Sequence, residues 1–145
     1  MREGGKLHKE GVAALCQRFG VATLYAFGSR GREALDWQQG RIDAMAAGLS
    51  DVDVGVRPVS GQAWTLDDKV GMAIALEDLL ACGRVDLVVL PEADPFLAAE
   101  IIRGERLFAR NEHDADEYDL YILRRAGDLI PLERERMALL LRSDR

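Results

Sequence analysis

The sequence has few of the residues that build disulfide-bonded or metal-bound folds. It contains two cysteines, two histidines and four prolines in 145 residues, and only 6% of it is aromatic. Cys16 and Cys82 stand far apart in apolar surroundings, which fits reduced core thiols better than a disulfide. His8 and His113 have no second ligand at zinc-binding spacing. An ordinary apolar core must therefore hold the fold.

Long apolar runs and an excess of positive charge are also missing. A membrane-spanning helix needs about 20 apolar residues, whereas the apolar runs here are strand-sized and the N-terminal residues contain no export signal. Lys and Arg number 19 against 25 Asp and Glu, a net charge of −6. Duplex nucleic acid is held largely by phosphate neutralisation. We therefore expect a cytoplasmic protein that binds neither a membrane nor duplex nucleic acid.

The composition that remains, 48% hydrophobic and 30% charged, is that of a globular protein. Helical and strand patterns alternate along the chain, which predicts an α/β fold. We expect one small domain over 1–145, with a mixed β-sheet flanked by helices, a core at about 8–110 and a helical C-terminal tail at about 113–142. Strands are predicted at 21–27, 51–57, 85–90 and 106–109, and helices up to Phe19, at 66–81 and at 95–103.

Two further helical segments are less regular. Apolar spacing predicts a short helix after Gly40, including Met45 and Leu49. The tail is helical from about 114 to 141, with breaks expected at Gly127 and Pro131.

A glycine and a serine follow directly after the apolar run at 21–27. Gly28 permits a close backbone approach, Ser29 offers a hydroxyl, and a helix start would present free N–H groups to an anion. Arg30 and Arg32 add positive charge. The segment is either a phosphate-binding loop or a strand-to-helix turn with a serine cap.

Two carboxylates open the second expected strand. Because side chains alternate across a strand, Asp51 and Asp53 share one face. Adjacent carboxylates repel each other unless a cation neutralises them, and Mg²⁺ prefers oxygen ligands. The pair is therefore either a metal site or an exposed strand end.

A third carboxylate, Asp86, lies inside the apolar strand at 85–90. Burial of an unpaired charge is costly, so Asp86 needs a partner. That partner is either a functional group or a salt bridge such as one to Arg84, unless the side chain is exposed at the strand edge.

Together, Gly28–Arg32, Ser50–Asp53 and Val85–Leu87 resemble the nucleotidyltransferase superfamily of DNA polymerase β. The short chain looks most like its minimal nucleotidyltransferase branch, which includes the MntA-like antitoxins that pair with HEPN toxins. The resemblance covers about 21–90, with weaker support from 102–108. It implies the nucleotidyltransferase fold.

The resemblance also implies roles for these residues. Asp51, Asp53 and Asp86 match the carboxylates that bind two Mg²⁺ ions, and Asp86 also helps to activate the attacking hydroxyl. The nucleotide's triphosphate is implied to lie against the turn and the arginines that follow it: Gly28, Ser29, Arg30 and Arg32.

The implied activity is a Mg²⁺-dependent transfer of AMP from ATP to a hydroxyl, that of a tyrosine on a cognate HEPN toxin. The chain would then act as an antitoxin. One alternative is a catalytically inactive antitoxin that neutralises its partner by contact. Another is an adenylyltransferase for a small molecule of the aminoglycoside type, although that activity usually needs an additional substrate domain.

The sequence departs from the family pattern between the two motifs. Gly31 and Glu33 stand where the family commonly has alanine and glycine, and the gap from Arg30 to Ser50 is longer than usual. The insertion either lengthens a helix and leaves both motifs in register, or reshapes the nucleotide site.

Two apolar features have both a structural and a functional interpretation. Trp37 and Trp64 either pack in the core or stack on a base. An apolar stripe in the tail either packs on the domain or binds a partner helix; it consists of Leu132, Met137, Leu140 and Leu141.

Overall fold

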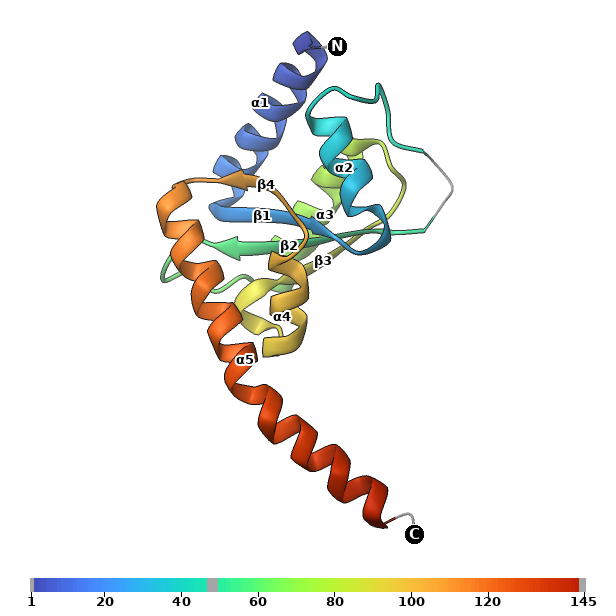
Figure 1. The fold of residues 1–145 in the computed structure, drawn as a ribbon. Helices are drawn as coiled ribbons and strands as arrows, with labels where there is room; N and C mark the ends of the chain where they lie inside the picture. Colours follow the sequence, from blue (N-terminus) through green and yellow to red (C-terminus); the bar gives the residue numbers. More distant parts are fainter. Residues whose placement is uncertain (1, 47–49, 144–145) are drawn as a thin grey trace.

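A computed structural model describes residues 2–46 and 50–143. Its centre is one four-stranded sheet in the order β3-β2-β1-β4 (Figure 1). Strand β1 runs antiparallel to both β2 and β4, whereas β2 and β3 are parallel. The strands are β1 (Val21–Phe27), β2 (Val52–Pro58), β3 (Val85–Val89) and β4 (Glu105–Ala109). The predicted mixed sheet is confirmed.

Helices cover both faces of this sheet (Figure 1). On one face lie α1 (Arg2–Phe19), α2 (Gly31–Gln38) and α3 (Leu66–Leu80); on the other lie α4 (Pro95–Ile102) and the first half of α5 (Glu112–Ser143). Two short 3₁₀ turns follow strands, η1 (Gly28–Arg30) after β1 and η2 (Leu90–Glu92) after β3. The predicted α/β class is confirmed.

The core has two parts, one on each side of the sheet. Alternate β2 residues Val52, Val54 and Val56 are buried towards α1, α2 and α3. Tyr25 and Phe27 of β1 belong to the second cluster, with α4 and α5. Every β1 residue is buried, because this strand is central and has helices on both faces. The other face of β2 carries Asp53, Gly55 and Arg57. Gly55 leaves room there for Ile101 of α4, and Asp53 lies at the start of the strand, where the candidate site is.

Helix α3 begins where the sequence predicts. Thr65 accepts a hydrogen bond from the backbone N–H of Asp68, and the Asp68 carboxylate accepts one from the Thr65 N–H, at 3.2 and 2.8 Å. This reciprocal capping box satisfies two N–H groups that the first helical turn leaves without a partner.

Helix α5 is continuous, so the predicted breaks at Gly127 and Pro131 are wrong. A proline removes one helical hydrogen bond, the one to the carbonyl four residues earlier, which here belongs to Gly127. Both residues are exposed, so water can satisfy that carbonyl. The loss of one bond does not end the helix.

Buried and charged contacts fix the start of α5 to the sheet. The Tyr25 hydroxyl donates to Asp119, and Arg106 donates to Asp119 and Asp116 at 2.7 and 2.9 Å.

Within the part of the chain that the structure describes, no helix is long and apolar enough to cross a membrane.

Candidate active site

The end of β1 lies against the start of β2. Phe27 pairs with Asp53 in the antiparallel register, and Gly28 follows with φ +70°. A Cβ atom on Gly28 would lie 2.7 Å from the Asp53 carboxylate oxygen Oδ2. Only glycine accepts both this backbone conformation and this approach. The turn therefore brings its backbone against the Asp53 carboxylate.

Two of the predicted site carboxylates are neighbours across parallel strands. Asp53 of β2 is in register with Asp86 of β3, and Val52 is in register with Val85. Paired residues of adjacent parallel strands point to the same face of the sheet. Asp51 directly precedes β2 and is two residues from Asp53. The structure thus brings four predicted site residues to one end of the sheet, where β1 ends and β2 and β3 begin: Gly28, Asp51, Asp53 and Asp86.

Burial and the neighbouring negative charges both affect the Asp53 carboxyl. Burial raises the pKa of the Asp53 carboxyl above its ordinary value, and the negative charges of Asp86, Asp51 and Glu100 raise it further. Repulsion among carboxylates is the condition that a bound cation relieves. The site is therefore one where a positive charge is favoured.

Glu100 was not predicted from the sequence. It lies on α4, which packs against β1, and it is the one charged residue within the apolar sequence of that helix. A lone charge in such a helix is the only sequence signal that points to it. The sequence does not show that the Glu100 charge acts on Asp53, because that effect depends on the packing of α4 against the sheet.

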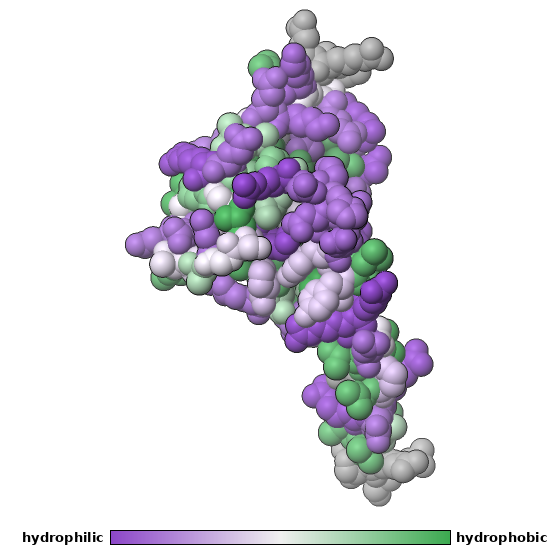
Figure 2. Space-filling model, turned by 90° about the vertical axis from the view of Figure 1, so that its left-hand side faces the viewer, coloured by the Kyte–Doolittle hydropathy of each residue, from purple (hydrophilic) through white to green (hydrophobic). Residues whose placement is uncertain are grey.

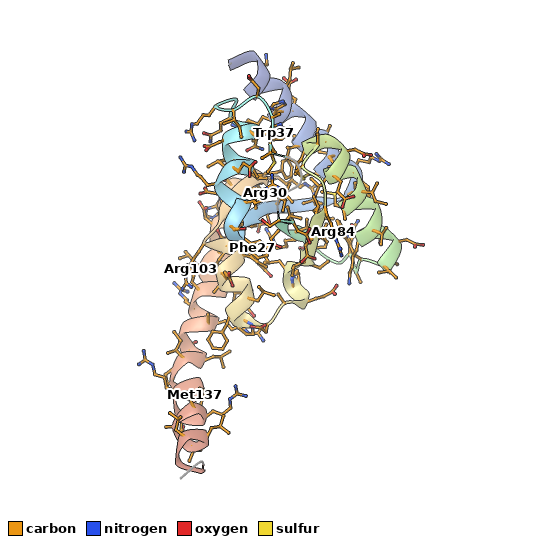
Figure 3. All side chains as sticks on the ribbon, turned by 90° about the vertical axis from the view of Figure 1, so that its right-hand side faces the viewer. Phe27, Arg30, Trp37, Arg84, Arg103 and Met137 are labelled. Carbon is orange, nitrogen blue, oxygen red and sulfur yellow. The ribbon has the colours of Figure 1, made fainter. Side chains whose placement is uncertain are left out.

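A cation already approaches one of the carboxylates. The Arg84 guanidinium lies 3.8 Å from the Asp51 carboxylate, and both side chains are exposed. Figure 3 shows Arg84 at the same end of the sheet as Phe27 and Arg30. Arg84 thus pairs with Asp51 rather than with Asp86. Asp86 itself is exposed, so the predicted alternative of an exposed side chain at the strand edge is confirmed.

Arg30 does not lie where a triphosphate ligand is expected. It is 4% exposed, and its guanidinium donates to Glu33 at 2.8 and 3.0 Å. It also donates to the carbonyls of Ser50, Cys82 and Ala46. All five of its N–H groups therefore have acceptors within the protein. Arg30 cannot bind a phosphate without giving up these bonds.

Arg32 keeps an exposed position on α2. Its guanidinium lies 3.4 Å from Asp36 and 3.9 Å from Glu105, with a side chain that is 66% exposed. Exposed ion pairs of this kind are weak. Ser29 is exposed in the η1 turn. Of the predicted phosphate ligands, these two side chains remain accessible.

The insertion between the motifs folds partly as α2 and partly as a loop. The short helix predicted after Gly40 is wrong for residues 41–46, and Leu49 lies outside the described residues. The backbone of Ala46 is engaged by side chains, because its N–H donates to Glu33 at 2.7 Å and its carbonyl accepts from Arg30. These bonds replace the helical ones.

The two tryptophans are structural. Trp37 and Trp64 are both buried, and the Trp37 ring stacks on His8 with ring centroids 4.0 Å apart. His8 Nδ1 also lies 2.7 Å from the Trp37 carbonyl. Packing, rather than stacking on a base, is therefore confirmed for both.

Two surface hollows lie away from the carboxylates. They have volumes of about 530 and 540 Å³ and share Val59 and Arg110 in their walls. Neither is lined by Gly28, Asp53 or Asp86. They surround the opposite end of β1 and belong to a different part of the surface.

The metal prediction can be compared with the carboxylate positions. Among residues 2–46 and 50–143, no three His, Cys, Asp or Glu side chains form a group ready to hold an ion. The three aspartates are nevertheless neighbours in chain or register, and the pKa of Asp53 is raised by the charges around it. Oxygen donors of this kind fit Mg²⁺, which keeps several waters and needs few protein ligands.

Similarity to known proteins is found in solved structures and not in the sequence comparisons. No protein-family model matches the sequence, and no curated protein matches it. A chain of a mutant MntA–HepT toxin–antitoxin structure matches with a TM-score of 0.66 at 17% identity, over 94% of this chain and 98% of that one. The chain has the nucleotidyltransferase fold. The fold implied by the motif resemblance is thereby confirmed.

Two further matches belong to the same group. One is a chain from the tri-AMPylated HEPN toxin of Shewanella oneidensis in complex with its MNT antitoxin, with a TM-score of 0.63 at 18% identity over 97% of this chain and 99% of that one. The other comes from a toxin–antitoxin structure with AMP-PNP, with a TM-score of 0.62 at 17% identity over 94% and 98%. At these identities the likeness establishes the fold alone.

Proposed function

We propose that this chain is a Mg²⁺-dependent nucleotidyltransferase that transfers AMP from ATP to a hydroxyl, that of a tyrosine on a cognate HEPN toxin, and so acts as an antitoxin. The observation that carries the proposal is the register pairing of Asp53 with Asp86, with Gly28 packed against the Asp53 carboxylate. The matched structures support it, because one is a complex with an AMPylated toxin and another is a toxin–antitoxin structure with an ATP analogue.

The site residues divide the work of this reaction into metal binding, triphosphate binding and proton transfer. Asp51, Asp53 and Asp86 would hold the metal. Bound Mg²⁺ supplies charge neutralisation for the attacking and leaving oxygens. Ser29 and Arg32 bind the triphosphate at the turn after β1. Asp86 accepts the proton of the attacking hydroxyl, whose oxygen bonds to the α-phosphorus while pyrophosphate leaves.

The proposal is tested with α-labelled ATP, Mg²⁺ and the protein encoded beside this gene. Label is expected on that protein with the wild-type chain and not with Asp53→Asn. A matched control is Asp67→Asn, because Asp67 is an exposed carboxylate at the start of α3, whereas the other end of that helix lies near Val85 and Asp86. Transfer that is unchanged in Asp53→Asn would contradict the assignment.

A contact-only antitoxin is the second candidate, and the exposed apolar residues at the end of α5 favour it. This candidate predicts that an Asp51→Asn/Asp53→Asn double variant protects cells from the toxin as well as the wild type does. A nucleotidyltransferase predicts that protection is lost although the complex still forms. Protection assays and complex formation, measured together, separate the two candidates.

A further inference from the structure

The second half of α5 projects beyond the rest of the molecule (Figure 1). The first half is anchored through buried Ala115, Ile122 and Ala126. From 127 to 141, none of the side chains that the structure describes is buried. Met137 lies far down this helix from the site residues (Figure 3). Packing on the domain therefore does not account for the sequence of this half.

This projecting half is rich in large apolar side chains (Figure 2). Leu132 is 61% exposed, Met137 48% and Leu141 65%. A solvated helix normally carries polar residues around its surface. The apolar stripe predicted from the sequence therefore does not pack on the domain, and its other interpretation, contact with a partner, remains.

The exposed large apolar side chains of this half spread over more than half of the helix circumference. Two lines bound this surface, with Leu139 close to the line of Leu132 and Leu140 between the two lines. Ile130, Met137 and Leu141 follow one line, at spacings of seven and four residues, and Leu132 lies on another. At about 100° per residue, Leu132 and Met137 are about 140° apart around the axis. One packed neighbour covers a stripe of roughly 100°. Covering both lines therefore takes contacts on two sides, as when a helix inserts into a groove.

We infer that the projecting half of α5, residues 130–141, is the docking element for the protein partner and inserts into an apolar groove on that partner. The inference rests on the proposed function, in which the partner is a HEPN toxin. A second copy of this chain fits less well, because pairing of two such helices side by side covers only one of the two lines.

Two observations favour the toxin as the occupant. The match to the chain from the toxin complex covers 97% of this chain, which leaves out only about four of its 145 residues. Most of the projecting helix therefore belongs to a fold that has been solved together with a toxin. In addition, α5 packs against α4, and Ile101 of α4 lies over Gly55, which is on the same face of β2 as Asp53, so α5 is on the face of the sheet that carries the Asp53 carboxylate.

The test compares two double variants of the full chain. Leu132→Asp/Met137→Asp changes one residue on each line. Val70→Asp/Ile74→Asp is the matched control, because these side chains are exposed to a similar degree on α3. Binding to the protein encoded beside this gene is measured by calorimetry, and circular dichroism checks that helix content and Tm are retained. We expect Kd to rise at least tenfold for the α5 variant and less than twofold for the control.

The outcomes also separate this inference from the proposed function. Tight binding by the α5 variant overturns the docking assignment, even if the wild type transfers AMP. Weakened binding with no AMP transfer by the wild type supports docking and removes the catalytic proposal. A wild-type dimer that the α5 variant converts to a monomer assigns the face to a second copy and overturns the inference. Absence of any wild-type complex overturns it as well.

Discussion

The backbone of Gly28 touches the carboxylate of Asp53: a Cβ atom at position 28 would lie 2.7 Å from Oδ2. Because glycine has no side chain, the turn after β1 can pack directly against the Asp53 carboxylate of β2. The left-handed conformation of Gly28, φ +70°, adds a second requirement for the same residue. The glycine–serine motif and the aspartate motif are therefore one structural unit.

Two glycine substitutions, compared with each other, separate the requirement for a left-handed backbone from the requirement for space beside Asp53. Gly61→Ala is the matched control, because Gly61 has φ +82° and open space around its Cβ position. We expect this control to lose about 1 kcal/mol of unfolding free energy from backbone strain alone. Gly28→Ala must also displace Asp53 and is expected to lose about 3 kcal/mol in total. Urea denaturation measures both; equal losses would contradict the close approach.

The raised pKa of Asp53 predicts a pH-dependent effect on stability. The folded state holds this proton more tightly than the unfolded state, so the stabilisation is present below the unfolded pKa and is lost as pH rises through the folded pKa. Asp53→Asn should therefore have a higher Tm than the wild type at pH 7, and the difference should shrink on acidification. Thermal melts across pH measure it. Added Mg²⁺ should stabilise the wild type more than the variant.

Arg30 is expected to matter for stability rather than for phosphate binding. Arg30→Ala leaves Glu33 and three carbonyls without their donor, a loss of about 3 kcal/mol. Arg32→Ala, on an exposed side chain, should change stability by less than about 0.5 kcal/mol. Because the Arg30 bond lowers the pKa of Glu33, this stabilisation is present at neutral pH and is lost as pH falls through the lowered pKa. Denaturation at neutral and acidic pH checks both statements.

Arg84 is expected to compete with a cation for Asp51. The ion pair is exposed, so it contributes at most about 1 kcal/mol. Arg84→Ala should therefore bind Mg²⁺ up to about fivefold more tightly at low ionic strength, and salt should remove the difference. Calorimetric titration with MgCl₂ measures this, with Arg32→Ala as the charge-matched control. Weaker Mg²⁺ binding by Arg84→Ala would contradict the competition.

Much of the fold was predictable from local patterns. The strands at 21–27 and 85–90 and the helix after Thr65 appear within one or two residues of their predicted bounds. Apolar periodicity and capping residues act over a few neighbouring positions, so they are legible in the sequence. The continuity of α5 was missed, because the effect of Pro131 depends on its exposure to water.

The candidate site was predictable only in part. The sequence by itself determined that a turn with Gly28 follows one strand, that Asp51 and Asp53 open a second and that Asp86 lies within a third. These features were legible because alternation along a strand and glycine conformation are local properties. Only the tertiary structure decided that the charge of Glu100 acts on Asp53, that Arg30 is turned into the protein and that Arg84 pairs with Asp51. The physical reason is that the partners of a charged side chain come from distant segments, and packing of the sheet and helices decides which of them meet.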